Sequence, residues 1–250
     1  MTPEQGPRIR ERYTRTLSLP PPFTLVPLRE SDDAFHHACA RAGELGAGSL
    51  VMVGRFDVAE FAVVLEPDEP LASARRAFYA GMLALTDTLA ALAPPEKPMF
   101  IEWPDAIYFD TGLVGGGRLG WPGSARERET PDWLVFGAII RTSAIGEPGF
   151  HPRATALEEE GFAVASAGHV VEGFTRHLMV ALDRWHESGF TLVAEGYASR
   201  LARESGLIRC IDKAGDLEIR HSRRSVERRN FLQALRTPSW LDPVTGEPHL

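Results

Sequence analysis

Three consecutive glycines, Gly115 to Gly117, stand where this chain otherwise has the pattern of a β-hairpin. An apolar run, Ala106 to Phe109, precedes a turn signal at Thr111-Gly112, and the chain returns from Leu113 to Leu119. This order predicts two paired antiparallel strands. Glycine within a strand lowers stability, so its presence marks either a bulge or a place where a ligand or another backbone comes close. Both interpretations stay open on these residues alone.

Length and composition limit the classes of protein that the chain can form. A chain of 250 residues with 44% hydrophobic side chains can bury one large core with a small appended domain. The formal net charge of −7 argues against nucleic acid as a partner, and no apolar run approaches the length of a membrane span. Cys39 and Cys210 lie far apart, which predicts a reduced, cytoplasmic compartment. The spacing of His169, His177 and His186 gives no metal-binding face, and no metal site is expected.

Hydrophobic periodicity predicts the other helices and strands. Ser31 or Asp32 is the expected cap of a first helix that ends at Leu45, and Pro94-Pro95 ends a long second one. The predicted helices cover residues 31–45, 71–92, 170–188 and 192–202, and the predicted strands 49–53, 61–65 and 133–140.

The hairpin resembles the signature of the biotin/lipoate A/B protein ligase superfamily. In that family Lys-Trp-Pro-Asn-Asp leads into a strand and a turn, and then into Lys-Leu-Ala/Val-Gly-Gly-Ile-Leu. The family's Ser-Thr-Asn-Asp corresponds to residues 30–33, and its Gly-Gly/Ala-Gly-Ile-Asn strand loosely to residues 136–140. The positions of the hairpin that match in order are Trp103, Pro104, Ile107, Tyr108, Val114, Gly115 and Gly116.

The resemblance implies an α/β (α+β) fold, with a ligase-type mixed or antiparallel sheet flanked by helices. The hairpin strands would form the floor of an acyl or biotin pocket, and the glycines would let the ligand lie against backbone. Biotin or lipoate is the implied ligand, and a carrier protein domain is a possible partner. The implied ligand-binding residues are Arg55, Trp103, Gly115, Gly116, Gly117, Arg118, Gly137 and Ala138.

Three departures put ATP-dependent activation in doubt. Glu102 replaces the lysine before the Trp-Pro pair, and Leu113 stands at the family's catalytic lysine, so no catalytic residue is assigned. The glycine- and arginine-rich loop that orders over the acyl-adenylate is reduced to a connection over residues 54–60. Arginine cannot replace lysine as a general base or acyl acceptor, and the chain has only two lysines, Lys97 and Lys213.

The last fifty residues are predicted to form a separate β-rich unit. Strands over residues 207–212 and 217–220 flank a turn, and Ile211, Asp212, Gly215 and Leu217 match the hairpin of the SH3-like C-terminal domain of biotin ligases. The predicted organisation is a leader over 1–22, a ligase-like domain over 23–203 and an SH3-like domain over 204–250. The latter ends in a capping tail whose Trp240 plugs a groove or docks a partner. Cys39 and Cys210 are expected to be structural rather than nucleophilic.

Three functions fit these observations. The first is a divergent ligase-like protein that binds a biotin, lipoyl or other acyl ligand and transfers it to a carrier protein by an unfamiliar arrangement. The second is a catalytically silent binding or regulatory module that has lost the adenylation loop and lysine. The third is an enzyme that acts on an unrelated small carboxylate in the same pocket. Phosphate chemistry discriminates the first two functions, because a ligase needs hydrogen-bond donors and cations that neutralise a polyphosphate. The sequence places few such groups near the expected pocket.

Overall fold

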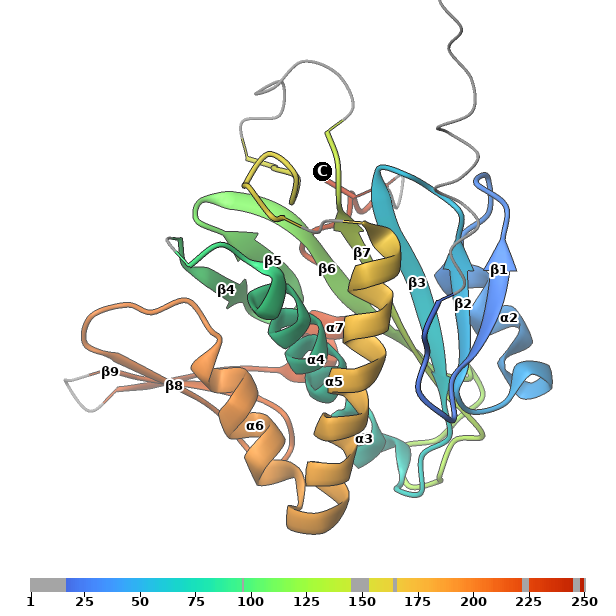
Figure 1. Ribbon diagram of the computed structural model, residues 1–250. Coiled ribbons are helices and arrows are strands. Elements are labelled where there is room, and N and C mark those ends of the chain that lie inside the picture. Colours follow the sequence, from blue (N-terminus) through green and yellow to red (C-terminus); the bar gives the residue numbers. More distant parts are fainter. Residues whose placement is uncertain are drawn as a thin grey trace, which may run out of the picture.

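The computed structural model describes residues 17–95, 97–144, 153–163, 166–221, 225–244 and 248–249. Its centre is a mixed seven-stranded sheet (Figure 1) with the order β1-β2-β3-β7-β6-β5-β4. β1 runs parallel to β2, and every other neighbouring pair is antiparallel. The strands are β1 (Thr24–Leu28), β2 (Ser49–Val53), β3 (Val58–Leu65), β4 (Met99–Glu102), β5 (Ala106–Phe109), β6 (Gly112–Gly120) and β7 (Leu134–Arg141).

The predicted hairpin is confirmed. β5 pairs with β6 in antiparallel register, with Ala106 opposite Gly116, and the register shifts at a bulge between Ile107 and Tyr108. On its other side β6 pairs with β7, so that Gly116 lies opposite Ile139 and Arg118 opposite Gly137. The glycine strand is therefore central, with a neighbour on each edge, and a missing side chain there matters for packing on both faces of the sheet.

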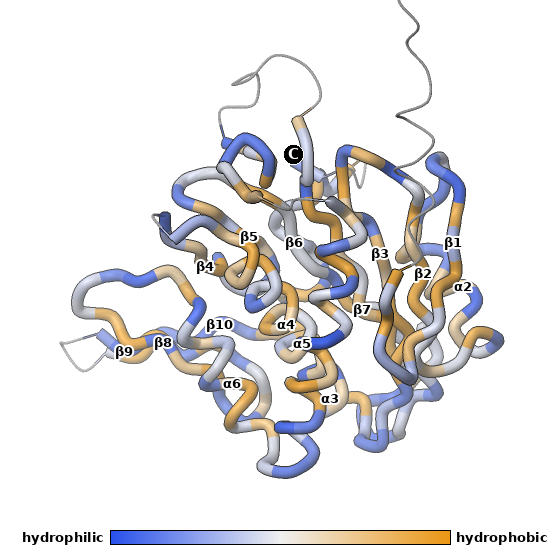
Figure 2. The backbone as a smooth tube through the Cα atoms, viewed as in Figure 1, coloured by the Kyte–Doolittle hydropathy of each residue, from blue (hydrophilic) through white to orange (hydrophobic). Residues whose placement is uncertain are grey.

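Helices cover both faces of the sheet. α4 (Ala77–Leu92), α5 (Ala167–Ser188) and α6 (Phe190–Ser199) pack together on one face (Figure 1). α2 (Ala34–Leu45) packs on β2, β3 and β7 from the other face, which we call the α2 face. Alternation along β3 divides the core, since Phe61 and Val63 join the larger cluster while Ala62 and Val64 join the α2 cluster. Figure 2 shows the hydrophobic residues concentrated in the strands of the sheet and in α4. None of the described helices is long and apolar enough to cross a bilayer.

Two helix boundaries differ from the sequence predictions. Asp33 caps α2 by accepting a hydrogen bond from the His36 amide, so the predicted caps Ser31 and Asp32 are wrong by one or two residues. The long helix expected over 71–92 is divided into α3 (Leu71–Ala74) and α4. The break lies at Arg75-Arg76, where the buried Arg75 guanidinium pairs with Glu127 at 2.5 Å. Arg75 and Arg76 keep helical φ and ψ, but the Phe78 and Tyr79 amides donate to the Arg75 and Arg76 carbonyls, three residues back, so a tighter turn interrupts the α-helix.

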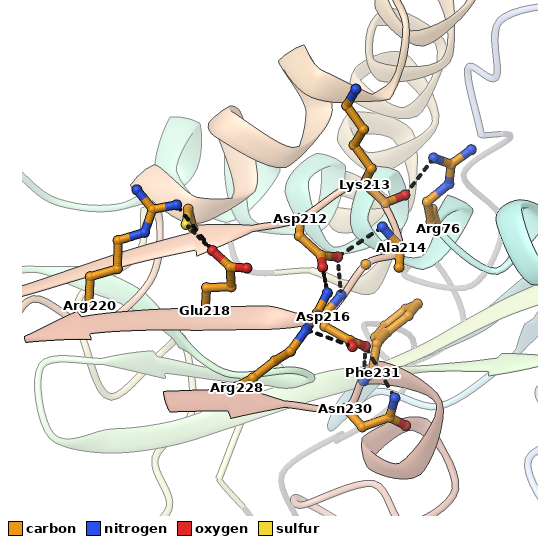
Figure 3. Close-up of polar contacts among 12 residues, drawn as sticks. Arg76, Asp212, Lys213, Ala214, Asp216, Glu218, Arg220, Arg228, Asn230 and Phe231 are labelled. Carbon is orange, nitrogen blue, oxygen red and sulfur yellow. Dashed lines mark hydrogen bonds and ion pairs between the residues drawn. The ribbon is translucent and has the colours of Figure 1, made fainter. Parts of the chain in front are cut away.

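The C-terminal unit is a three-stranded antiparallel sheet of β8 (Leu207–Ile211), β9 (Leu217–His221) and β10 (Val226–Arg229), followed by α7 (Phe231–Leu235). Arg228 bridges Asp212 and Asp216 (Figure 3), and Asp216 accepts the Phe231 amide. The buried Tyr79 hydroxyl of α4 donates to the Gly215 carbonyl at 2.5 Å, which ties the unit to the main core. The predicted hairpin of this unit is confirmed, while its SH3-like class stays a prediction.

Candidate functional site

The sequence suggested a ligand pocket over Gly115 to Gly117. In the structure the three glycines do not face one common cavity. Side chains alternate across a strand, so Gly116 faces the α2 face and Gly117 faces α4. A Cβ on Gly117 would lie 2.6 Å from the Met82 sulfur and 2.9 Å from the Phe136 ring. Gly115 has a φ of +149°, and a Cβ there would collide with the backbone carbonyl of Ile139. Gly116 faces the space on the α2 side of the sheet that the C-terminal tail occupies.

Trp240 fills that space. Its side chain is 1% exposed and lies directly on Gly116, where any Cβ would collide with the indole and with the Asp105 carbonyl. The indole N–H donates to the Gly117 carbonyl at 3.1 Å. We call this space the tryptophan slot; its walls are Val58, Ala106, Leu113 and Ile139, Tyr108 packs at its margin, and the tail residue Leu241 packs there beside Trp240. Trp240, predicted to plug a groove or dock a partner, is thus buried against β6.

The buried Asp105 carboxylate binds Ser239, the residue before Trp240. Asp105 is 2% exposed, and it accepts the Ser239 amide at 2.9 Å and the Ser239 hydroxyl at 2.6 Å. Burial raises the pKa of Asp105 to about 6, and the two Ser239 hydrogen bonds offset only part of that effect. Sequence reasoning missed this pair. The available signal was that Asp105 directly follows the Trp-Pro motif at a position where the family carries asparagine.

The raised pKa of Asp105 predicts a pH-dependent stability. The folded protein binds this proton more tightly than the unfolded chain, whose aspartates titrate near 3.8. The stabilising contribution is therefore complete below about pH 4 and is lost as the pH rises through about 6. We expect the free energy of unfolding of the intact protein to fall by about 2–3 kcal/mol relative to Asp105→Asn between these limits. Urea titrations at several pH values measure it, and a difference that is constant with pH would contradict it.

Charged side chains lie next to the tryptophan slot on the α2 face. Arg118 pairs with Asp33 at 3.1 Å and stacks on the Phe35 ring, 4.2 Å from the ring centroid. Arg55, in the β2–β3 loop, pairs with Asp57 at 2.8 Å and lies 3.9 Å from Glu60. Burial raises the pKa of Glu60, although the Ala34 amide donates to it at 3.0 Å. We call Asp33, Arg55, Asp57, Glu60 and Arg118 the polar cluster.

The polar cluster adjoins the slot through the register of the sheet. Glu60, Ile139 and Gly116 are successive partners across β3, β7 and β6, and Ile139 and Gly116 belong to the slot. Arg118 follows Gly116 on the same face of β6, about 7 Å further along the strand. An apolar group in the slot would thus have cations and carboxylates at one end. In the structure each arginine of the cluster is paired with a carboxylate.

The predicted ligand-binding residues lie in three different places. Gly116, Arg118 and Gly137 lie on the α2 face, where Phe35 covers Gly137, and Arg55 reaches the same face through Glu60. Three others lie on the opposite face of the sheet. Trp103, Gly117 and Ala138 belong to the face that packs on the helices: the Trp103 indole N–H donates to the Tyr79 hydroxyl at 3.2 Å, and Gly117 and Ala138 are register partners. Gly115 lies against the Ile139 backbone and contacts no open space. Successive side chains of β6 and β7 point to opposite faces of the sheet, so residues that are adjacent in the motif lie on different faces.

The lysine and the phosphate-binding loop of the family have no equivalent among the described residues near the slot. Leu113 is buried in the wall of the tryptophan slot. Only four residues, 54–57, connect β2 to β3, and Arg55 is their one cation. Lys97 pairs with Glu160 at 2.5 Å, and Lys213 lies in the turn between β8 and β9 (Figure 3). A run of main-chain amides that could hold a polyphosphate is therefore lacking in that loop.

Neither cysteine has the properties of a nucleophile. Burial raises the pKa of Cys39 to about 11, and burial also raises that of Cys210, whose sulfur contacts Glu218 at 3.8 Å. Within the described part of the chain, no three His, Cys, Asp or Glu side chains are grouped so as to hold a metal ion.

A separate cavity of about 450 Å³ lies at the surface of α4 and α5. It contains none of the predicted ligand-binding residues, and its polar lining includes Asp87 and Arg200, which pair with each other at 2.5 Å. The cavity is a competing location for a small molecule and serves as a reference in the tests below.

Comparisons with known proteins identify similar sequences and folds. A sequence model described as the biotin/lipoate A/B protein ligase family matches residues 19–199. A biotin protein ligase-like protein of unknown function from Silicibacter sp. TM1040 has a similar structure, with 27% identity, a TM-score of 0.71, and 85% of this chain and 96% of that chain covered. None of the curated proteins matches the sequence significantly.

Structures of established biotin ligases share the fold at lower identity. The apo biotin protein ligase of Aquifex aeolicus is 17% identical with a TM-score of 0.63, over 83% of this chain and 99% of that one. The Leishmania major biotin protein ligase in complex with biotin is 15% identical with a TM-score of 0.53, over 84% and 99%. Similarity at this level shows the fold alone.

Proposed function

Because the chain belongs to the biotin/lipoate A/B protein ligase family, we propose that it binds a biotin, lipoyl or other acyl group in the tryptophan slot without activating it with ATP. One contact carries this proposal. The Trp240 indole occupies the slot as an apolar ring against Gly116 while its N–H satisfies the Gly117 carbonyl. The slot therefore has the shape and the acceptor of a site for an apolar group with a polar edge.

The polar end of such a ligand would meet the polar cluster. A carboxylate or carbonyl oxygen that extends from the slot toward Arg118 could compete with Asp33, whose own ion pair is half exposed. Burial opposes ionisation of Asp33, but the His36 amide and Arg118 outweigh it and lower its pKa, so Arg118 keeps an anionic partner in the unliganded protein. A ligand carboxylate would then exchange one charge-assisted hydrogen bond for another.

We also propose that the chain is organised into two domains with different roles. Residues 23–203 would form the ligand-binding domain, and residues 204–250 would form an SH3-like domain that ends in the capping tail. The family match over 19–199 supports this boundary. The α7 residue Phe231 and the tail residue Trp240 are both buried against the main domain, so the tail would act on the ligand-binding domain directly.

A second candidate function, transfer of an already activated acyl group to a carrier protein, is favoured by Asp105. Ser239 holds the Asp105 carboxylate beside the slot, and a carboxylate placed next to a reacting amine can act as a general base. In that reaction the carrier amine would attack a thioester carbonyl. The new C–N bond would form as the C–S bond breaks, and Asp105 would accept the amine proton.

Equilibrium binding tests the first proposal. Isothermal titration of the intact protein with biotin, lipoate and octanoate should show one-to-one binding of at least one of them, and Arg118→Ala should weaken that binding by about tenfold or more. Arg126→Ala is the matched control, because Arg126 is 80% exposed and pairs only with the nearby Glu129 at 3.3 Å. Absence of binding by the intact protein and by the tail variants described below would refute the proposal, as would equal losses in the two arginine variants.

A further inference from the structure

We propose that residues 238–241 are a displaceable internal ligand that closes the tryptophan slot until an acyl ligand replaces Trp240. This inference rests on the proposed function, because it assigns the tail and the ligand to the same slot. It adds a competition between them that the family match does not imply.

The first support is that Trp240 satisfies a backbone group that the sheet leaves open. At the end of the β5–β6 ladder the Gly117 amide donates to the Asp105 carbonyl at 3.0 Å. The return bond of such an antiparallel pair would come from the Asp105 amide to the Gly117 carbonyl, and it is not made. The Gly117 carbonyl accepts the Trp240 indole N–H instead. The indole N–H thus takes the place of a backbone amide of a neighbouring strand. A ligand with a hydrogen-bond donor could take the same place.

The second support is that few contacts hold the segment. Ser239 binds Asp105 through its amide and hydroxyl, and Trp240 and Leu241 supply the apolar contact. On either side the chain is exposed, at Arg236 and Thr237 before the segment and at Pro243 and Val244 after it. Beyond it, the His249 amide donates to the Trp240 carbonyl at 2.9 Å, which folds the tail on itself rather than on the sheet. Release of residues 238–241 would therefore leave the strands and helices of the main domain in place.

The third support is the cost of burying Asp105. The segment covers a carboxyl whose pKa is raised by burial, so the closed arrangement keeps a desolvated acid beside the slot. Withdrawal of Ser239 and Trp240 would return this carboxyl toward water. In the closed state, burial of Trp240 is favourable and burial of the Asp105 carboxyl is unfavourable. The second effect lowers the free energy needed to release the segment.

Competition predicts that weakening the tail increases ligand affinity. The apparent dissociation constant of a ligand equals its intrinsic value divided by the fraction of open protein. If the slot is open in less than about a tenth of the molecules, removing the plug should tighten binding by about tenfold or more. We therefore expect Trp240→Ala, in the full-length chain, to bind biotin, lipoate or octanoate at least about tenfold more tightly than the intact protein.

Two further variants complete the experiment. Ser239→Ala removes the hydroxyl bond to Asp105 without opening a cavity, and it should tighten binding by a smaller factor, which keeps the test decisive if Trp240→Ala fails to fold. Val244→Ala is the control in the same tail, because Val244 is 90% exposed, and it should bind as the intact protein does. Isothermal titration gives all the affinities, and circular dichroism verifies folding.

The outcomes separate the two proposals. Tighter binding in Trp240→Ala or Ser239→Ala supports the internal ligand. Affinities that equal or fall below that of the intact protein overturn it and leave the proposed function standing. No binding by the intact protein, Trp240→Ala or Ser239→Ala overturns the proposed function itself, and the competition with it.

Discussion

Gly115→Ala is expected to destabilise the fold by about 3 kcal/mol or more. The residue has a φ of +149°, which alanine rarely adopts, and a Cβ there would collide with the Ile139 backbone carbonyl in the adjacent β7. A strained backbone conformation costs about 1–3 kcal/mol, and overpacking adds about 1–3 kcal/mol because backbone cannot move aside as a side chain can. Urea unfolding of both proteins measures the difference.

Gly123→Ala is the matched control for this prediction. Nothing lies within 4 Å of a Cβ at Gly123, and the substitution should change the free energy of unfolding by less than about 0.5 kcal/mol. Similar stabilities for the two variants would show that the close approach of β6 and β7 at Gly115 is not a feature of the folded protein. In that case the glycine run would lose its structural explanation.

Pyrophosphate exchange driven by biotin, lipoate or octanoate is expected to be slower than in a biotin protein ligase by about 10⁴-fold or more. One preorganised donor at a reacting group is worth about 10²–10³ in rate, and this chain lacks both the lysine, at Leu113, and the loop of amides between β2 and β3. The two arginines nearest the slot are already paired with carboxylates. Radiolabelled pyrophosphate with MgATP measures the exchange, and the Aquifex aeolicus biotin protein ligase is the positive control.

Leu113→Lys sharpens this experiment. The new side chain would enter the wall of the tryptophan slot, at the family's lysine position, but the phosphate loop would still be missing. We therefore expect exchange to remain at least about 10²-fold below that of the ligase. Robust exchange by the unaltered protein would show that its activation site is intact and that a different group performs the role of the lysine.

The local pattern of the sequence predicted much of the fold. The hairpin, α2 and α5 have strong apolar periodicity, and each lies within a few residues of its expected place. β1 was missed because Pro27 interrupts a short edge strand, and β10 because its four residues, Val-Glu-Arg-Arg, are all exposed. The stability of such strands comes from pairing with a neighbour, which a single segment does not reveal.

The candidate site was only half predictable. The glycine motif identified the correct strand, but the motif does not say which glycine faces which layer, and alternation sends Gly117 and Trp103 toward the helices. The sequence does not mark Asp105 as a site residue, since the burial that raises its pKa and its contact with Ser239, 134 positions away, both arise only in the folded chain. Contacts between the tail and β6 are set by the whole fold. Expecting Trp240 to fill a groove was possible, whereas identifying the groove as the slot over Gly116 required the structure.

Amide chemical-shift mapping shows whether a ligand enters the tryptophan slot and displaces Trp240. The isotope-labelled protein is titrated with biotin, lipoate and octanoate, and the signals of Gly115 to Gly117 are followed together with the Trp240 indole N–H. We expect the ligand that binds to shift the glycine amides and to move the indole signal toward its position in water, as Trp240 leaves the Gly117 carbonyl. Shifts confined to the cavity of α4 and α5, with the glycine amides and the indole unchanged, would contradict it.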